Sequence, residues 1–290
     1  MIKFISLLRP HQWLKNIFVF LPLFFDKKLL HIDYLVNAIW AFAAFSLAAS
    51  AIYCLNDIMD IEADKRHPKK RLRPLASGKI SKAQAYVIMA ILIIASLAIA
   101  GIAFESKNLL AIIAIYIVLN IGYCIRLKHI AIVDVFIIAS GFCLRVAAGG
   151  VATDIWISQW IILQTFLLAL FLAFAKRRDD VVLFNRDGSK ARKNINRYNL
   201  EFLNNAISIV ATMTMMCYIM WCVSEEVIAR MGTNQLYITA VFALMGVMRY
   251  LQLTMVDNKS GSPTKILLKD RFIHFCVAGW VATFLVLIYM

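Results

Sequence analysis

Long apolar runs alternate along the chain with short polar and charged segments. The runs lack the period-two alternation of membrane β-barrel strands, and most approach the ~20 residues that a helix needs to cross a bilayer. The first run is short and contains Pro22; it could be the core of a signal peptide, but no small-residue cleavage site follows Phe25, so we keep it. The pattern predicts nine transmembrane helices, over residues 16–31, 34–55, 82–103, 108–126, 130–151, 156–175, 201–223, 234–252 and 271–290.

The composition agrees with a polytopic membrane protein. Of the 290 residues, 62% are hydrophobic and only 17% are charged, whereas soluble domains carry about 25% charged residues. No low-complexity segment separates one part of the chain from another. We therefore expect an all-α membrane protein with a single transmembrane domain over residues 1–290.

The charge is distributed unequally across the predicted membrane. The formal net charge is +14. Most of the 31 Lys and Arg residues lie before residue 16 or in and beside the loops 56–81, 127–129, 176–200 and 253–270, which share one side of a nine-span topology. The positive-inside rule makes this side cytoplasmic. The excess charge thus reflects topology and attraction to anionic lipids or phosphates, and nucleic acid is not an expected partner.

Carboxylates gather where the second predicted span ends. In the segment NDIMDIEAD the three aspartates are spaced three and four residues apart, so on one continuing helix they face the same direction, with Asn56 close to them. These aspartates are Asp57, Asp60 and Asp64. Like charges repel unless a cation neutralises them, and Mg²⁺ is held by carboxylates together with substrate phosphates. The spacing therefore predicts a magnesium site.

A basic loop follows the aspartates, and it contains Lys70 and Arg73 before Pro74 and Gly78. The charges could simply pair with the acids at a solvated helix end. However, carboxylates for a metal followed by cations for a phosphorylated ligand are what a diphosphate site requires. We therefore favour a Mg²⁺–diphosphate site.

The motif NDxxDxxxD after a membrane helix, followed by RPLASG, resembles the first aspartate-rich motif of the UbiA-type intramembrane prenyltransferase superfamily. The resemblance implies nine helices around a lipid-facing cavity with Mg²⁺ and diphosphate at its cytoplasmic mouth. It makes Asp57, Asp60 and Asp64 the metal ligands, and Asp57, Asp60 and Asn56 the catalytic residues. Aromatic prenyltransferases of the superfamily carry a second aspartate motif, where this chain has the sequence AKRRDD.

Four further segments resemble the decaprenyl-phosphate phosphoribosyltransferase subgroup. They are LRPHQWLKNIFVFLPLFF, YCIRLKHIAIVDVFIIASGFCLRVAAGG, AKRR and SPTKILLKDR. The resemblance implies Mg²⁺-dependent transfer of 5-phosphoribose from phosphoribosyl diphosphate (PRPP) to a polyprenyl phosphate, either decaprenyl or undecaprenyl phosphate, with release of diphosphate. It also implies an enzyme of cell-envelope biosynthesis in the bacterial cytoplasmic (inner) membrane, with its active site facing the cytoplasm and with membrane lipids around it.

The cations of the basic side fit such substrates, because PRPP carries a diphosphate and a 5-phosphate and the acceptor brings a third anionic group. We expect substrate contacts from the interfacial Lys15, from the end of the fourth span, and from the cations in place of the second aspartate motif. The alternatives to substrate contact are that these side chains snorkel to the membrane interface, or that they only reflect the positive-inside distribution of charge. The residues are Lys15, Lys70, Arg73, Tyr123, Arg126, Lys128, Lys176, Arg177 and Arg178.

Two other functions compete with this interpretation. One is transfer of a prenyl group from a prenyl diphosphate to an aromatic or other acceptor, which the missing second motif disfavours. The other is a lipid or ion transporter, which the scarcity of charges in the middle of the spans disfavours. The sequence leaves open the roles of Asp134 and Arg145, which lie inside the fifth span, and of Asp179 and Asp180.

Overall fold

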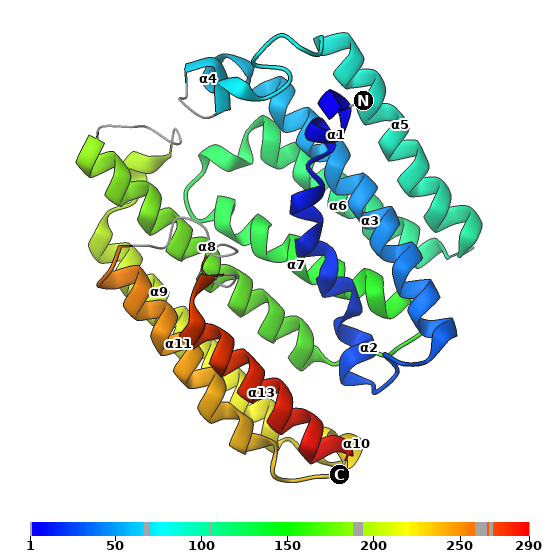
Figure 1. Ribbon diagram of the computed structural model, residues 1–290, viewed down its shortest axis with the longest axis vertical. Helices are drawn as coiled ribbons and strands as arrows, with labels where there is room; N and C mark the ends of the chain where they lie inside the picture. The colour runs from blue at the N-terminus through cyan, green and yellow to red at the C-terminus, as the bar shows by residue number, and fades with distance from the viewer. Residues whose placement is uncertain are drawn as a thin grey trace. The chain divides into compact units, whose positions relative to one another are not determined.

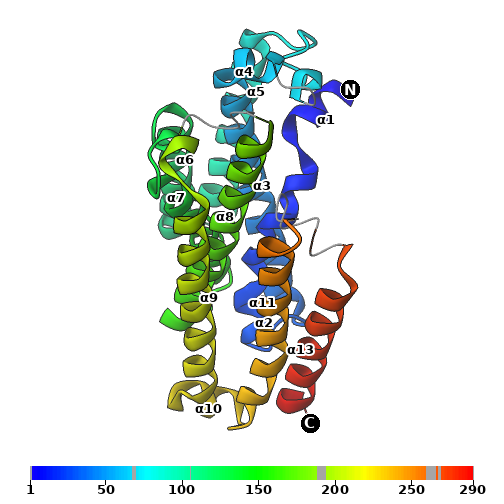
Figure 2. The same ribbon diagram turned by 90° about the vertical axis from the view of Figure 1, so that its left-hand side faces the viewer.

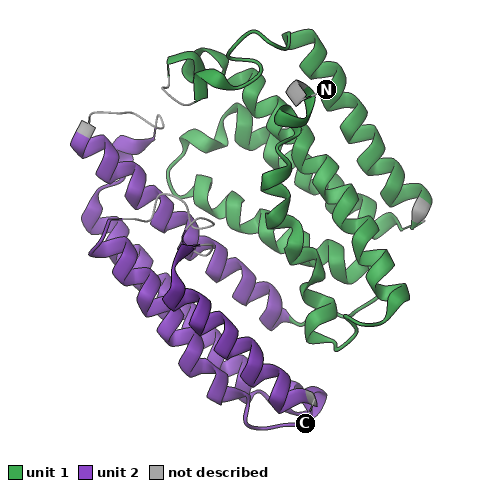
Figure 3. Cartoon of the chain, viewed as in Figure 1, with its two compact units in different colours: residues 1–158 green, residues 159–290 purple. Residues whose placement is uncertain are grey.

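The computed structural model describes residues 2–66, 70–104, 106–187, 194–258, 266 and 269–289. It divides into two compact units, residues 1–158 and residues 159–290 (Figure 3). All regular elements within these ranges are helical, which confirms the predicted all-α membrane fold.

Unit 1 is built around the long helix α3. Its elements are α1 (Ile2–Leu8), η1 (Pro10–Phe20), α2 (Leu21–Phe25), α3 (Ile32–Met59), α4 (Ile61–Arg66), η2 (Lys70–Leu72), α5 (Lys82–Ala98), η3 (Ile99–Ala103), α6 (Lys107–Ile125), η4 (Leu127–His129) and α7 (Val133–Ala152). Helices α5, α6 and α7 and the segment η1 all pack against α3 (Figure 1). Ser81 and Gln84 form a capping box that begins α5.

Unit 2 contains α8 (Gln159–Asp187), η5 (Ile195–Arg197), α9 (Leu200–Val223), α10 (Glu225–Met231), η6 (Leu236–Thr239), α11 (Ala240–Met255) and α13 (Arg271–Tyr289). Helix α8 packs along α9, and α11 packs along α13 (Figures 1 and 2). Asn199 caps the start of α9, and Gly232 ends α10 in the left-handed conformation that glycine adopts without strain.

Eight helices in the described ranges are long and apolar enough to cross a membrane. They match the second to ninth predicted spans and cover Ile32–Met59, Lys82–Ile102, Lys107–Ile125, Val133–Ala152, Gln159–Arg186, Leu200–Val223, Leu236–Met255 and Arg271–Ile288. The predicted first span, residues 16–31, is instead the 3-10 helix η1 followed by the short helix α2. Pro10 and Pro22 stand at the first turns of these two pieces, where their missing N–H groups are tolerated.

The predicted boundaries also change at two charged ends. Helix α3 continues past residue 55 to Met59, and α8 continues past residue 175 to Asp187. The sequence rule ended each span at the first charges, but a helix can leave the membrane without losing its backbone hydrogen bonds. Lys176, Arg177 and Arg178 therefore lie on a helix and not in the predicted loop.

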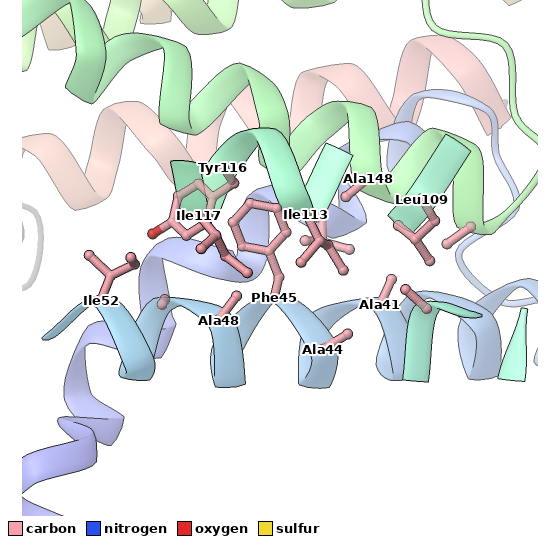
Figure 4. Packing of buried hydrophobic residues seen from close by; sticks show 14 of the residues in the cluster. Ala41, Ala44, Phe45, Ala48, Ile52, Leu109, Ile113, Tyr116, Ile117 and Ala148 are labelled. Atoms are coloured by element: carbon pink, nitrogen blue, oxygen red, sulfur yellow. The ribbon is translucent and has the colours of Figure 1, made fainter. Parts of the chain in front are cut away.

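The core of unit 1 lies between α3 and α6. Phe45 packs on Tyr116 with their ring centroids 4.5 Å apart, and Ile113 lies beside them (Figure 4). Ala41, Ala44 and Ala48 recur on the same face of α3 and are fully buried. Their small side chains let the neighbouring helices approach closely, as is common in membrane helix packing.

The segment η1 lies against α7 and α3. Its backbone comes so close to α7 that a Cβ atom on Gly149 would lie 1.9 Å from the carbonyl oxygen of Val19. On the α3 side, Trp13 Nε1 donates to Ser50 Oγ at 3.0 Å and Asn16 Nδ2 donates to Ser46 Oγ at 2.9 Å. This packing fixes the side chains of η1 beside α3 and α7.

We expect Gly149→Ala to destabilise the protein by about 1–3 kcal/mol or more, because the added methyl group meets backbone and cannot be accommodated by a rotamer change. Thermal unfolding in detergent measures the effect. Gly246→Ala is the matched control, since its Cβ would meet only Cys276 Cβ at an ordinary 3.6 Å. Equal melting temperatures of the two variants would contradict the close approach of η1 and α7.

Candidate functional site: the aspartate motif and its cations

The aspartate motif spans the junction between α3 and α4. Helix α3 ends at Met59, and Asp60 leaves the helical conformation with φ −100° and ψ 8°. Helix α4 begins at Ile61, and Asp64 N donates to Asp60 O at 2.8 Å across the junction. The predicted single helix is therefore interrupted at its middle aspartate. Helix α4 ends at Arg66, and residues 67–69 lie outside the described residues.

Asp57 and Asp64 meet at one guanidinium group. Arg73 Nη1 lies 3.2 Å from Asp57 Oδ1 and 2.6 Å from Asp64 Oδ2. Both aspartates are buried, with relative exposures of 2% and 3%. Arg73 belongs to the basic loop, so the structure brings the two halves of the motif together. Asp57 also pairs with Arg9.

Asp60 points to a different cation. Lys128 Nζ, in η4 after the fourth predicted span, lies 2.7 Å from Asp60 Oδ1. Asn56 faces the same region, where Cys124 Sγ contacts its Oδ1 at 3.9 Å. The interruption at Asp60 explains the split, because a continuing helix would keep the three carboxylates on one face.

The remaining unit 1 candidates lie around these contacts. Arg126 is exposed at the end of α6, Tyr123 packs against the core, and Lys70 begins η2, where its carbonyl accepts from Arg73 N at 2.9 Å. Their roles stay predictions.

Arg9 is a site residue that the sequence reasoning missed. It lies between α1 and η1 with φ 51° and ψ 59°, in the left-handed region, and its guanidinium group lies 5.1 Å from the centre of the Tyr53 ring. Such backbone strain in a non-glycine residue is typical of functional positions. The dipeptide Arg9-Pro10 was the available signal, because a proline restricts the residue before it.

The carboxylates suit a hard cation. Asp57 Oδ2 is buried and has no hydrogen-bond partner among the described atoms, and the other oxygen of Asp57 shares Arg73 with Asp64. No group of three His, Cys, Asp or Glu side chains in the described ranges is arranged to hold a metal, so the predicted three-aspartate set is not assembled. Two carboxylates are enough for Mg²⁺ when substrate phosphates supply further ligands. The residues present therefore fit the ion.

A second polar centre of unit 1 lies in the middle of α7. Arg145 Nε donates to Asn16 Oδ1 at 2.8 Å, its Nη1 donates to the Gly141 carbonyl at 2.6 Å, and its Nη2 donates to Tyr116 Oη at 3.2 Å. Its guanidinium carbon also lies 5.1 Å from the ring centres of Phe45, Tyr116 and Phe142. The sequence marked Arg145 as unusual but could not identify these partners. Asp134, in the first turn of the same helix, is fully buried.

Lys15 precedes Asn16 on η1, outside the eight candidate spans, and is partly buried. Burial and, to a smaller extent, the nearby positive charges of Arg145 and Arg9 together lower the pKa of Lys15 to about 8. Lys15 makes no hydrogen bond or ion pair within the described ranges. It is thus a cation held near two other cations.

In unit 2, Arg177 and Arg178 are buried on α8 and Lys176 is exposed. Arg177 Nη1 pairs with Asp180 Oδ2 at 3.0 Å. Arg178 donates to Asn204 Oδ1 at 2.7 Å, to the Thr254 carbonyl at 2.7 Å and to Asn258 Oδ1 at 2.8 Å. These contacts fasten α8 to α9 and to the end of α11, so they favour a structural role for Arg178 over the predicted phosphate contact.

Comparisons with known proteins agree with the helical architecture and the motif. Residues 28–276 match the UbiA prenyltransferase family. The chain is 35% identical to the decaprenyl-phosphate phosphoribosyltransferase of Mycolicibacterium smegmatis, over 96% of this chain and 90% of that protein. It is 33% identical to the enzyme of that name from Corynebacterium glutamicum, over 99% of this chain and 86% of that protein. A UbiA homolog from Archaeoglobus fulgidus bound to GPP and Mg²⁺ shares the fold, with a TM-score of 0.71, 17% identity, and coverage of 99% of this chain and 100% of that one.

Proposed function

The chain belongs to the UbiA prenyltransferase family, and we propose that it transfers 5-phosphoribose from PRPP to a polyprenyl phosphate with release of diphosphate. Similarity to decaprenyl-phosphate phosphoribosyltransferases over nearly the whole chain supports this assignment. One observation in the structure carries it: cations from three separate segments converge on the aspartate motif. They are Arg9, Arg73 and Lys128.

This arrangement suits a reaction in which every participant is a phosphate ester. Asp57 and Asp64, with Asp60 beside them, would hold Mg²⁺, which when bound supplies charge neutralisation for the diphosphate leaving group. Asn56 is placed to orient a ligand or water. Arg73 and Lys128 neutralise the aspartates in the absence of substrate and are placed to contact phosphate oxygens when substrate and metal arrive.

The acceptor phosphate is already anionic at neutral pH, so the reaction needs no strong general base. Attack of the acceptor oxygen on the anomeric carbon in a single displacement predicts inversion at that carbon. The residues of the site then contribute positioning and charge stabilisation. Lys15, Lys70, Tyr123 and Arg126 remain our candidates for further substrate contacts, together with Lys176, Arg177 and Arg178.

The direct test is to incubate the purified protein with Mg²⁺, labelled PRPP and polyprenyl phosphates of several lengths. We expect a labelled phosphoribosyl lipid and stoichiometric diphosphate. A parallel incubation with a labelled prenyl diphosphate and aromatic acceptors tests the competing chemistry. Prenylation of an aromatic acceptor without formation of phosphoribosyl lipid would overturn the proposed function in favour of prenyl transfer.

The topology supports a proposal for the location of the reaction. The eight long apolar helices and the family membership make the chain an integral membrane protein. The distribution of Lys and Arg supports a cytoplasmic active site, in a bacterial inner membrane, with the substrates reaching it from the cytoplasm and from the lipid phase. We also propose that residues 1–290 act as one functional domain.

The binding of the phosphate-bearing substrate at Lys15 should depend on pH. Because the pKa of Lys15 is about 8, the side chain is charged below this pH and loses its charge as the pH rises through it. We expect the apparent KM for the substrate that contacts Lys15 to rise above about pH 8. In Lys15→Arg, which stays charged, the same rise should be absent, and identical pH profiles for both proteins would contradict the assignment.

A further inference from the structure

Arg145 is a buried cation of unit 1. It is 6% exposed and lies in the middle of a candidate membrane span. Its hydrogen bonds in the described ranges go to an amide oxygen, a backbone carbonyl and a phenol, and none goes to a carboxylate. An isolated charge inside a membrane protein is costly, so such residues are usually paired or functional.

The surroundings orient the guanidinium group without neutralising it. Three aromatic rings face it at 5.1 Å, and Phe45 and Tyr116 belong to the packed core shown in Figure 4. A guanidinium group has five N–H donors, and three of them are used here. Nη1 and Nη2 therefore each retain one N–H that has no acceptor in the part of the chain that the structure describes.

A second cation lies close to Arg145. Lys15 precedes Asn16, whose amide oxygen accepts from Arg145, and the close approach at Gly149 fixes η1 against α7. Lys15 has no ion-pair partner in the described ranges. Two cations held near each other in a poorly solvated region repel, and an anion between them would remove both the repulsion and the burial cost.

Resting on the proposed function, we propose that Lys15, Asn16 and Arg145 form a subsite for a phosphate monoester, separate from the diphosphate site at the aspartates. Lys15 and the open N–H groups of Arg145 would bind the phosphate oxygens, and Asn16 positions the guanidinium group. Both substrates carry a phosphate monoester: PRPP at its 5-position and the polyprenyl phosphate at its head. Arg9 interacts with a residue of each site, because it pairs with Asp57 and its charge acts on Lys15.

The alternative is that Arg145 only fastens η1 to α7. A fastening role would change stability and would leave the affinity for phosphates unaltered. The test therefore measures binding directly, in purified full-length protein, with ribose 5-phosphate as the probe for the PRPP arm and farnesyl phosphate as the probe for the lipid arm. Farnesol, which lacks the phosphate, is the reference for the second probe.

We expect Arg145→Met and Lys15→Met to weaken the binding of one of these two probes by roughly 10- to 150-fold, the loss expected for a charge-assisted hydrogen bond. Farnesol binding should be unchanged, and Lys15→Arg should restore most of the affinity. The probe whose binding is weakened shows whether the subsite takes the phosphate of PRPP or that of the lipid. Ser50→Ala is the matched control, because it loosens η1 from α3 without touching a charge; we expect a lower melting temperature and unaltered affinities.

Unaltered affinity of Lys15→Met for both probes would overturn the subsite. Lys15→Met removes no hydrogen bond of the described structure, so it provides this test even if Arg145→Met fails to fold. The outcome is separate from the test of the overall reaction. Turnover of PRPP with unaltered probe binding would leave the proposed function standing and remove the subsite. If instead probe binding depends on Lys15 but the protein forms no phosphoribosyl lipid, the subsite would stand and the proposed function would be removed.

Discussion

Asp57→Asn is expected to lower turnover by about 100-fold or more while the protein stays folded. Asp57 is the most enclosed carboxylate of the motif. One of its oxygens is shared between Arg9 and Arg73, and the other is buried with no hydrogen-bond partner among the described residues. The amide keeps the shape but removes a metal ligand and a charge, and losing one such preorganised group typically costs 10²- to 10³-fold in rate. Steady-state turnover across a Mg²⁺ titration, with circular dichroism to verify folding, measures the effect.

Two further variants sharpen this result. Asp60→Asn should also abolish Mg²⁺-dependent turnover, because we propose that Asp60 acts together with Asp57 and Asp64. In the structure its carboxylate pairs with Lys128. Glu62→Gln is the control within the motif, because Glu62 is exposed and, among the described residues, pairs with Lys65 on the same helix. Its turnover should match the wild type. Activity of Asp57→Asn within a factor of a few of the wild type would remove the metal assignment.

Arg178→Ala is expected to destabilise unit 2 by roughly 2–4 kcal/mol, because it leaves the buried Thr254 carbonyl and the side chains of Asn204 and Asn258 without their donor. The melting temperature in detergent should fall. If Arg178 also binds substrate phosphate, as the sequence predicts, the apparent KM for PRPP or polyprenyl phosphate should rise by roughly 10- to 150-fold at temperatures where the variant is folded. An unaltered KM with a lower melting temperature would leave only the structural role.

The neighbouring aspartates distinguish the two enzymatic chemistries. Asp180→Asn removes an ion-pair partner of the fully buried Arg177, so it too should lower stability, and its activity must be measured well below its melting temperature. In the phosphoribosyl reaction this variant should be less damaging than Asp57→Asn. Prenyl transfer becomes the better assignment if Asp179→Asn and Asp180→Asn lower turnover as much as Asp57→Asn does and Arg178→Ala leaves the KM unchanged.

The helices and the motif could be predicted because they depend on local patterns. Apolar runs of sufficient length identified the eight long helices, and the spacing of Asp57 and Asp64 correctly indicated that these two side chains share a direction. The interruption at Asp60 depends on tertiary packing, since Lys128 is far away in sequence. No local pattern distinguishes an aspartate that continues a helix from one that turns out of it.

Other residues depend on contacts that no local pattern contains. Arg178 and Lys176 are two residues apart and both are cations. Yet Arg178 is buried among acceptors from α9 and α11, and Lys176 is exposed. Arg9 becomes a site residue only because α1 and η1 bring it back to the end of α3. The distribution of charge along the sequence could therefore not predict which cations reach the site.

The irregular segment η1 has a consequence for how the chain is made. A 3-10 helix of Pro10–Phe20 that leads into the five-residue helix α2 cannot enter the bilayer as an independent helix, because lipid offers no partners for imperfectly bonded backbone groups. The surfaces that receive it belong to α3 and α7, and Gly149 of α7 is synthesised long after the N-terminus leaves the ribosome. This segment must therefore wait, at the membrane surface or with the insertion machinery, until α7 has been made.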